Sequence, residues 1–160
     1  MRGIAAAAGV DAALLHHYFG TKQQLFIAAM ALPVDIAVVV PMLMAGPPDG
    51  VGERFIRFVL AQWEQPAVRP LFLGIVRSAS TDPVAAAMLR ATLAEGPLLA
   101  IARALGTPDA QLRATLAGSQ FIGLIMARYV VGVEPLASVD AEVVARVVGP
   151  TIQRYLAGDL

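Results

Sequence analysis

The sequence predicts an all-α protein in which a small N-terminal helix-turn-helix precedes a larger helical domain. Three observations support this fold class. Apolar residues recur at helical spacing, almost no segment alternates as a half-buried strand does, and proline, glycine and capping residues divide the chain into helix-sized pieces. The chain of 160 residues is long enough to bury one good core with a small appendage.

The first two helices are predicted over residues 2–8 and 11–19. Gly9 ends the first helix, because glycine accepts the left-handed conformation found at helix ends. Asp11 caps the second helix, because its carboxylate accepts the free N–H groups of a first turn. Two helices joined by a tight glycine turn form a helix-turn-helix.

A longer helix is predicted from Lys22 to about Ala45, with kinks at Pro33 and Pro41. Residues 21–24 have the Thr-x-x-Gln pattern of a capping box at its start. Each proline removes a backbone hydrogen bond and bends the helix.

Two helices are predicted between the Gly-Pro-Pro turn and residue 78. Asp49 is expected to cap the first, which ends before Pro66, and residues 71–78 form a short apolar helix. Apolar residues of the first helix recur at helical spacing.

Three helices complete the prediction. Asp82 opens a helix that reaches about residue 106 and bends at Gly96, and Thr107 opens one that reaches about Val131. Both caps are followed by proline, which favours the first helical position. The last helix spans 138–156, with Asp140 and Glu142 in its first turn and a kink at Gly149-Pro150.

Composition limits the kinds of partner. The chain is 58% hydrophobic and 15% charged, where soluble domains have roughly 25% charged residues, so a partner, ligand or lipid is expected to cover apolar surface. Twelve basic and twelve acidic residues cancel, so phosphate binding must come from a local patch. Cysteine is absent, which excludes disulfides, thiolate metal sites and cysteine nucleophiles.

A membrane location is not expected. The segment 25–46 is long enough to span a bilayer, but Asp35 within it would cost about 2.5–3.5 kcal/mol on insertion scales and two prolines interrupt it. No signal-peptide pattern is visible, so we expect a cytoplasmic protein.

The adjacent His16 and His17 do not fit a metal or catalytic site. Consecutive residues on a helix diverge by about 100°, whereas zinc-binding histidines on a helix are spaced i, i+4. No nucleophile stands on a recognisable strand-turn-helix elbow. We therefore predict no metal, no cofactor and no enzymatic activity, and the plainest alternative is a pair of surface histidines.

The helix over 11–19 is predicted to bury Val10, Leu15 and Phe19. Its outward face combines small residues, which let a helix approach a major groove, with side chains that can donate to phosphates or base edges. Lys22 stands at a helix N-terminus, where free amides favour an anion. The predicted outward residues are Ala12, Ala13, His16 and His17.

Residues 4–26, IAAAAGVDAALLHHYFGTKQQLF, resemble the DNA-binding signature of the tetracycline-repressor (TetR) family of bacterial transcription regulators. The later helices, including the tail PLASVDAEVVARVVGPTIQRYL, look like the family's effector-binding and dimerisation domain. The resemblance implies a partial DNA-binding domain over 1–28 and an effector-binding and dimerisation domain over 29–160. The matching residues are Ile4-Ala5, Gly9-Val10, Leu15, His16 to Tyr18, Phe19 and Lys22.

The resemblance also implies which residues meet DNA. Asp11 and Lys22 would lie near phosphates, the alanines against base edges, and His16 and Tyr18 on phosphate or base. Family members normally carry a further helix and a basic arm before the point where this sequence begins, so an open core is expected beside Ile4 and Phe19. The full expected set is Asp11, Ala12, Ala13, His16, His17, Tyr18, Thr21 and Lys22.

A homodimer and an effector pocket follow from the same resemblance. The family pairs its last two helices with their copies, and intramolecular core is the alternative for every residue named. The expected interface residues are Leu124, Ile125, Arg128, Val144, Val147, Val148, Ile152 and Tyr155. The expected pocket residues are Trp63, Phe72, Met88, Phe121, Met126 and Tyr129, with Asp35, Arg77 or Gln120 as polar anchors.

The sequence thus predicts a DNA-binding transcriptional regulator, a repressor that a small, mainly apolar effector releases from a double-stranded DNA operator. The alternative is a truncated family relative that dimerises, with or without binding a ligand, and does not bind DNA. A membrane-associated helical protein is a distant third.

Overall fold

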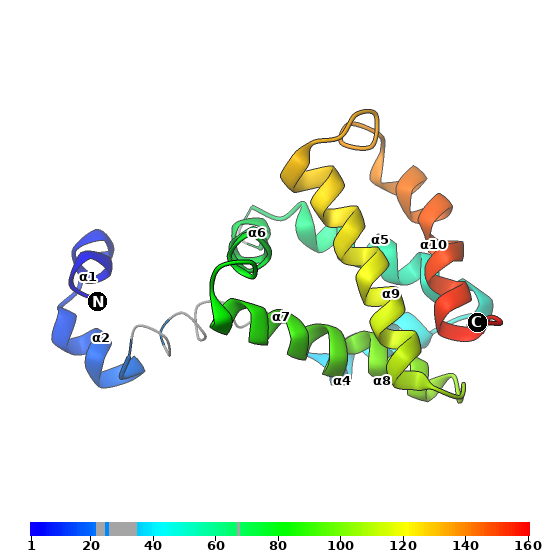
Figure 1. The fold of residues 1–160 in the computed structure, drawn as a ribbon, viewed down its shortest axis with the longest axis horizontal. Coiled ribbons are helices and arrows are strands. Elements are labelled where there is room, and N and C mark those ends of the chain that lie inside the picture. The colour runs from blue at the N-terminus through cyan, green and yellow to red at the C-terminus, as the bar shows by residue number, and fades with distance from the viewer. Residues whose placement is uncertain (22–24, 26–34, 67) are drawn as a thin grey trace. The chain divides into compact units, whose positions relative to one another are not determined.

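The computed structural model describes residues 1–21, 25, 35–66 and 68–160, and every regular element in these ranges is helical (Figure 1). The predicted all-α class is confirmed. The chain divides into two compact units, Met1–Pro33 and Val34–Leu160.

The N-terminal unit contains α1 (Arg2–Ala8) and α2 (Ala12–Phe19). Gly9 closes α1 in the left-handed conformation with φ 68°, and Asp11 accepts the N–H of Ala13 at 2.8 Å, so both predicted caps are confirmed. Val10 is 40% exposed, contrary to its predicted burial, because it lies in the turn before α2.

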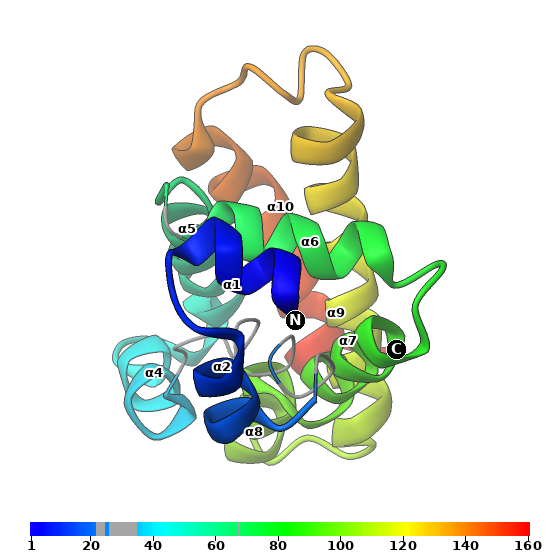
Figure 2. The same ribbon diagram turned by 90° about the vertical axis from the view of Figure 1, so that its left-hand side faces the viewer.

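The C-terminal unit is a bundle in which α10 lies along α5 and α9, while α8 packs on α9 and α4 (Figure 2). Its largest fully buried side chains include Trp63, Ile56, Ile125 and Ile152. The elements are α4 (Ile36–Met44), the 3-10 turn η1 (Pro48–Gly50), α5 (Val51–Trp63), α6 (Arg69–Ser78), α7 (Pro83–Glu95), α8 (Pro97–Ala104), α9 (Ala110–Ile125), the π-helical segment η2 (Met126–Val131) and α10 (Ala141–Ala157).

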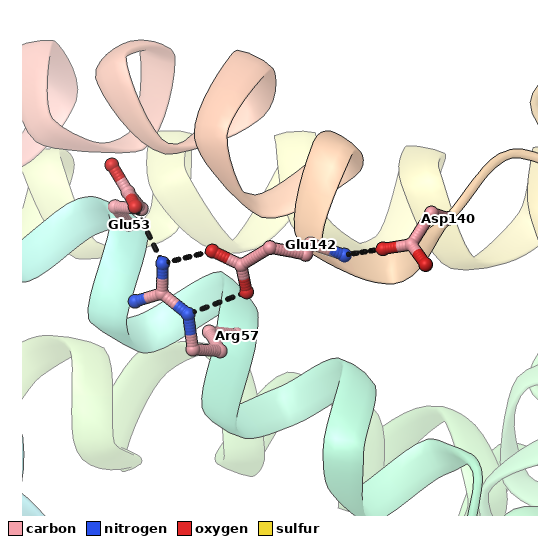
Figure 3. Close-up of polar contacts among 4 residues, drawn as sticks. All are labelled: Glu53, Arg57, Asp140 and Glu142. Atoms are coloured by element: carbon pink, nitrogen blue, oxygen red, sulfur yellow. Dashed lines mark hydrogen bonds and ion pairs between the residues drawn. The ribbon is translucent and has the colours of Figure 1, made fainter.

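Side-chain caps confirm one predicted helix start and shift another. Asp82 accepts the N–H groups of Val84 and Ala85 at 2.7 and 3.1 Å. Asp140 accepts the N–H of Glu142 at 2.7 Å (Figure 3), so α10 begins after Asp140 rather than at Ser138.

Other predicted boundaries are wrong. The helix expected over 22–45 is interrupted at Asp35, which caps α4 by accepting the N–H of Ala37 at 2.9 Å. Asp49 lies within η1 and gives α5 no side-chain cap. The bend expected at Gly96 is a full break between α7 and α8, and a Cβ there would lie 2.1 Å from the carbonyl oxygen of Thr92.

Thr107 does not cap α9, contrary to the prediction. Its hydroxyl donates to the carbonyl oxygen of Leu156 at 3.0 Å and to that of Ala102 at 3.3 Å, while α9 begins at Ala110 after Asp109. The last carbonyls of a helix have no partner within the helix, and Thr107 satisfies two of them at the ends of α8 and α10.

The α5–α10 crossing depends on two glycines. A Cβ on Gly149 would lie 2.6 Å from the Cα of Glu53, and a Cβ on Gly52 would lie 2.3 Å from the carbonyl oxygen of Gly149. The N–H of Gly52 donates to the side-chain oxygen of Gln153 at 2.8 Å. The two backbones therefore approach to a separation that a side chain would prevent.

An ion-pair network joins the same two helices at the surface. Arg57 on α5 donates to both carboxylate oxygens of Glu142 on α10, at 2.8 and 2.5 Å, and to Glu53 at 2.5 Å (Figure 3). The hydrogen bonds to Glu142 and then to Glu53 raise the pKa of Arg57. The hydrogen bond from Arg57 lowers the pKa of Glu142.

A buried arginine holds the C-terminal end of α10. Arg113 is 7% exposed and donates to the carbonyl oxygens of Pro108, Tyr155 and Gly158 at 2.8, 3.1 and 2.8 Å. It thereby satisfies carbonyls at the end of α10, where a positive charge is also favoured by the helix dipole.

Two stretches, Pro83–Ala104 and Ala110–Val131, are long and apolar enough to cross a membrane by length and composition. Both also supply core residues, among them Ile101 from α8 and Phe121 from α9. The core helices of globular proteins pass the same test of length and composition. Part of the segment 25–46 considered above lies outside the described residues.

Candidate nucleic-acid interface and effector region

The outer face of α2 carries the residues expected to meet DNA. Ala13, His16, His17 and Tyr18 are exposed, Tyr18 to 72%, while Ala12 is half-buried. Asp11 and Thr21 are exposed as well. Lys22, the remaining member of the expected set, lies outside the described residues.

The two histidines differ in what holds them. The Nδ1 of His16 donates to the carbonyl oxygen of Gly20 at 2.7 Å, which fixes the ring against the last turn of α2 and leaves Nε2 for another partner. The ring of His17 packs edge-on against Tyr18, with centroids 5.4 Å apart. The surface thus presents one anchored imidazole and one aromatic pair.

Sequence reasoning missed Leu14, which is 48% exposed. It stands three residues before His17 and four before Tyr18, so helical spacing places it on their face. That spacing was the available signal. An exposed leucine beside two aromatic rings makes this face more apolar than the alanines alone suggest.

The structure brings only some of the residues expected to line an effector pocket into contact with one another. Trp63 is fully buried and stacks on Tyr129, with ring centroids 5.5 Å apart and 20° between planes. Phe121 packs edge-on against Phe55 at 5.8 Å. Met88 and Met126 are half-buried. The side chain of Phe72 lies outside the description.

The expected polar anchors also differ in position. Asp35 is exposed and serves as the cap of α4, Arg77 is exposed and Gln120 is half-buried. Two other arginines, Arg69 and Arg128, approach the Tyr129 ring, with guanidinium carbons 5.0 and 5.3 Å from its centroid. Nothing in the sequence indicated that Arg69 joins this ring, because the pairing is made by tertiary packing.

A surface hollow of about 500 Å³ lies between η1, α5 and α10. None of the expected pocket residues lines it. Its lining surface is mainly apolar, and sequence periodicity gave no indication of it. The lining residues are Pro48, Asp49, Glu53, Gly149, Pro150, Gln153, Arg154, Ala157 and Gly158.

The expected interface residues divide by burial. Leu124, Ile125, Val144 and Ile152 are at most 5% exposed within the single chain, and Arg128 is 8% exposed. These side chains are enclosed by the chain's own helices and present no surface to a second copy. Val148 and Tyr155 are half-buried, and Val147 is 67% exposed. The dimer itself stays a prediction, in which Val147 is the accessible member.

Arg128 has a structural role within the chain. Its Nη1 donates to the carbonyl oxygens of Leu136 and Val139 at 2.6 and 2.7 Å, which fastens the segment between η2 and α10. Burial of a guanidinium is compensated only in part by neutral carbonyl acceptors.

Two family models match the chain. Residues 1–29 match the model of bacterial regulatory proteins of the tetR family, and residues 49–156 match the tetracyclin repressor-like C-terminal domain. Among solved structures, a TetR-family regulator from Streptomyces coelicolor A3 is 38% identical, with a TM-score of 0.55 and coverage of 96% of this chain and 80% of that chain. Curated proteins contain no match to this sequence.

Proposed function

We propose, because this chain belongs to the tetR family and is a transcriptional regulator, that it acts in the cytoplasm as a repressor released by a small molecule. Residues 1–28 would contact a double-stranded DNA operator, and residues 29–160 would bind the effector and a second copy of the chain. No catalytic role is proposed.

The observation that carries DNA binding is the outer face of α2. Ala13, His16, His17 and Tyr18 are exposed together on a short helix that follows a glycine turn. Recognition helices of helix-turn-helix proteins place such residues in the major groove, where small side chains allow close approach and polar ones reach base edges or phosphates.

The apolar surface of α9 and α10 supports the dimer. Val147 on α10 is 67% exposed and Leu112 on α9 is 53% exposed. Exposed apolar side chains on the last two helices suit an isologous interface, in which the same patch of two copies pairs about a twofold axis. A twofold axis would set two copies of α2 against successive major grooves, about 34–36 Å apart.

Release requires that the effector distinguish two arrangements of the dimer. A ligand that binds equally to both arrangements does not change their populations. The effector must therefore bind more tightly to the dimer whose α2 spacing does not match DNA. At saturation, the effector then lowers the affinity for the operator by at most the ratio of its own affinities for the two dimer arrangements.

A titration of fluorescently labelled DNA that flanks the protein's own gene tests the proposal. Binding should weaken as salt rises, because phosphate contacts release counterions. His17→Ala should weaken binding, whereas Gln65→Ala, at an exposed position after α5, should leave it unchanged. Equal effects of the two substitutions on DNA affinity would contradict the proposal that the outer face of α2 contacts DNA.

The dimer has its own test. Val147→Glu should give a monomer by light scattering while the helical content stays unchanged. Val38→Glu provides a matched control, because Val38 on α4 is 63% exposed and carries the same change. A dimer that survives Val147→Glu would place the interface elsewhere.

The second candidate function is a family relative that dimerises and binds ligand without recognising DNA. One observation favours it: Ile4, Val10 and Leu14 of the N-terminal unit are 40–48% exposed, which leaves apolar surface on a helix-turn-helix uncovered. The same titration decides between the two. A chain that is dimeric by light scattering and shows no salt-dependent DNA binding would have this second function.

A further inference from the structure

The aromatic and cationic side chains around Tyr129 form a cluster with unused binding capacity. The Tyr129 ring stacks on Trp63 and has the guanidinium carbons of Arg69 and Arg128 at 5.0 and 5.3 Å from its centroid. One phenol ring thus meets an indole and two cations. We call these four residues the Tyr129 cluster.

Two polar atoms of the Tyr129 cluster are buried without a hydrogen-bond partner among the residues that the structure describes. They are the hydroxyl of Tyr129 and the Nε of Arg128. Arg128 is 8% exposed, and its two carbonyl contacts use Nη1 only. Buried donors are rarely left unpaired, because the lost interaction with water is not replaced.

The cluster also carries uncompensated positive charge. Across residues 1–21, 25, 35–66 and 68–160, the ion pairs between side chains involve Arg57 alone, so Arg69 and Arg128 have no carboxylate partner there. A buried guanidinium without a counter-ion is unfavourable. An anionic group placed beside the two arginines would supply both the missing charge and the missing acceptor.

The backbone gives an independent indication at the same place. Arg128 and Tyr129 lie in η2, a π-helical segment of 6 residues that continues α9. Such segments are rare and occur frequently at functional sites. Arg69 is exposed and Tyr129 is half-buried, so the cluster reaches the surface of the C-terminal unit.

We propose that the Tyr129 cluster is the effector site and that the effector is a planar aromatic carboxylate, an inference that rests on the proposed function. The ligand's ring packs beside Trp63 and Tyr129, and its carboxylate accepts hydrogen bonds from the guanidinium groups and from the Tyr129 hydroxyl. Charge-assisted hydrogen bonds of this kind are the strong ones. The effector is then anionic rather than mainly apolar.

Trp63 is the only tryptophan of the chain, so its fluorescence reports directly on the cluster. The experiment titrates the full chain with benzoate and with benzamide, its uncharged counterpart of nearly the same shape. We expect a saturable change in Trp63 emission with benzoate at a Kd about tenfold or more below that of benzamide, since hydrogen bonds to charged groups contribute more than neutral ones.

Three variants locate the site. Arg69→Gln should weaken benzoate binding about tenfold and bring the two Kd values together. Arg103→Gln makes the same change in charge at an exposed position of α8, at the other end of α9 from η2 (Figure 1), and should leave both Kd values unchanged. Tyr129→Phe should weaken benzoate binding while the Tm of the free protein stays the same or rises, because the deleted hydroxyl has no hydrogen-bond partner among the described residues.

Each other result overturns the inference. Equal Kd values for benzoate and benzamide, no saturable response to either, equal effects of Arg69→Gln and Arg103→Gln, or a Tm lowered by Tyr129→Phe would assign the cluster to structure alone. DNA titration without ligand separates this from the repressor proposal. A chain that binds its DNA but not benzoate would support the repressor proposal and contradict the effector site. A chain that binds benzoate but no DNA would support the effector site and contradict the repressor proposal.

Discussion

Replacing Gly149 by alanine should lower the free energy of unfolding, because α5 and α10 cross at this residue with their backbones in contact. The new Cβ would lie 2.6 Å from the Cα and 2.9 Å from the nitrogen of Glu53, whereas carbon atoms in contact sit about 3.5–4.0 Å apart. Both obstructing atoms belong to the backbone and cannot rotate away. The two helices must therefore separate by roughly 1 Å.

The cost can be worked out from this separation. Overpacking costs about 1–3 kcal/mol, and stretching the bond from Gly52 to Gln153 adds about 1 kcal/mol. The higher helix propensity of alanine raises the free energy of unfolding by about 1 kcal/mol and offsets part of this loss. We expect a net loss of about 2 kcal/mol, which lowers Tm by about 4–8 °C in a chain of this length.

Urea unfolding followed by far-ultraviolet circular dichroism measures the loss. Gly123→Ala is the matched control, because Gly123 is an exposed residue of α9 and an added Cβ would meet no described atom within 4 Å beyond its neighbours and its own helix backbone. This variant should gain up to about 1 kcal/mol. Both variants are measured at two protein concentrations, so that a change in association is distinguished from a change in fold. A Gly149→Ala protein as stable as the wild type would refute the reasoning.

Three further substitutions test the local contacts. Arg113→Met leaves three carbonyl oxygens in part-buried hydrogen bonds without their donor and should cost about 2–4 kcal/mol in urea unfolding. Arg103→Met at an exposed site should cost under about 0.5 kcal/mol. Asp82→Ala removes the cap of α7 and should cost about 1 kcal/mol, with a neutral result counting against the cap. Glu142→Gln should lower Tm at neutral pH. The hydrogen bond from Arg57 lowers the pKa of Glu142 from its ordinary value of 4.5. The stability that this ion pair contributes is therefore full above pH 4.5 and is lost as pH falls through the pKa of Glu142 in the folded protein, so the difference in Tm should vanish in acid. A difference in Tm that persists in acid would contradict the ion pair.

Helix starts could be predicted from the sequence where capping is a local matter. Asp11 and Asp82 each accept N–H groups two or three residues ahead, so the interaction is complete within a short segment. Thr107 was mistaken for a cap because its hydroxyl is used 49 residues away, at the end of α10. Asp49 was mistaken for a cap because it lies within the 3-10 turn η1, and Gly50 stands at the N-cap position of α5.

The face that a helix buries could be predicted, but not what covers it. Helical spacing groups Ile125 with Phe121 and Ile152 with Val148, and the same apolar pattern serves a core and an interface between copies. The chain's own packing buries Ile125 and Ile152 and leaves Val147 exposed. Only three-dimensional packing separates these cases.

Only the two aromatic members of the Tyr129 cluster could be predicted from the sequence as effector-site residues. Trp63 and Tyr129 were expected near an effector as large aromatic residues on central helices. Arg69 and Arg128 carried no sequence signal for that place, because α6 and η2 meet through tertiary packing and an arginine's partners depend on what surrounds it. The charge of the site is therefore a structural result.

The central claim is that the exposed face of α2 meets DNA in a protein held together as a dimer. One measurement tests it most directly: an anisotropy titration of labelled DNA flanking the protein's own gene, with the chain's concentration carried past saturation to give the stoichiometry. The account predicts two chains per duplex and an affinity that falls as salt rises. Saturation with one chain per duplex, or no binding at low salt, would contradict it.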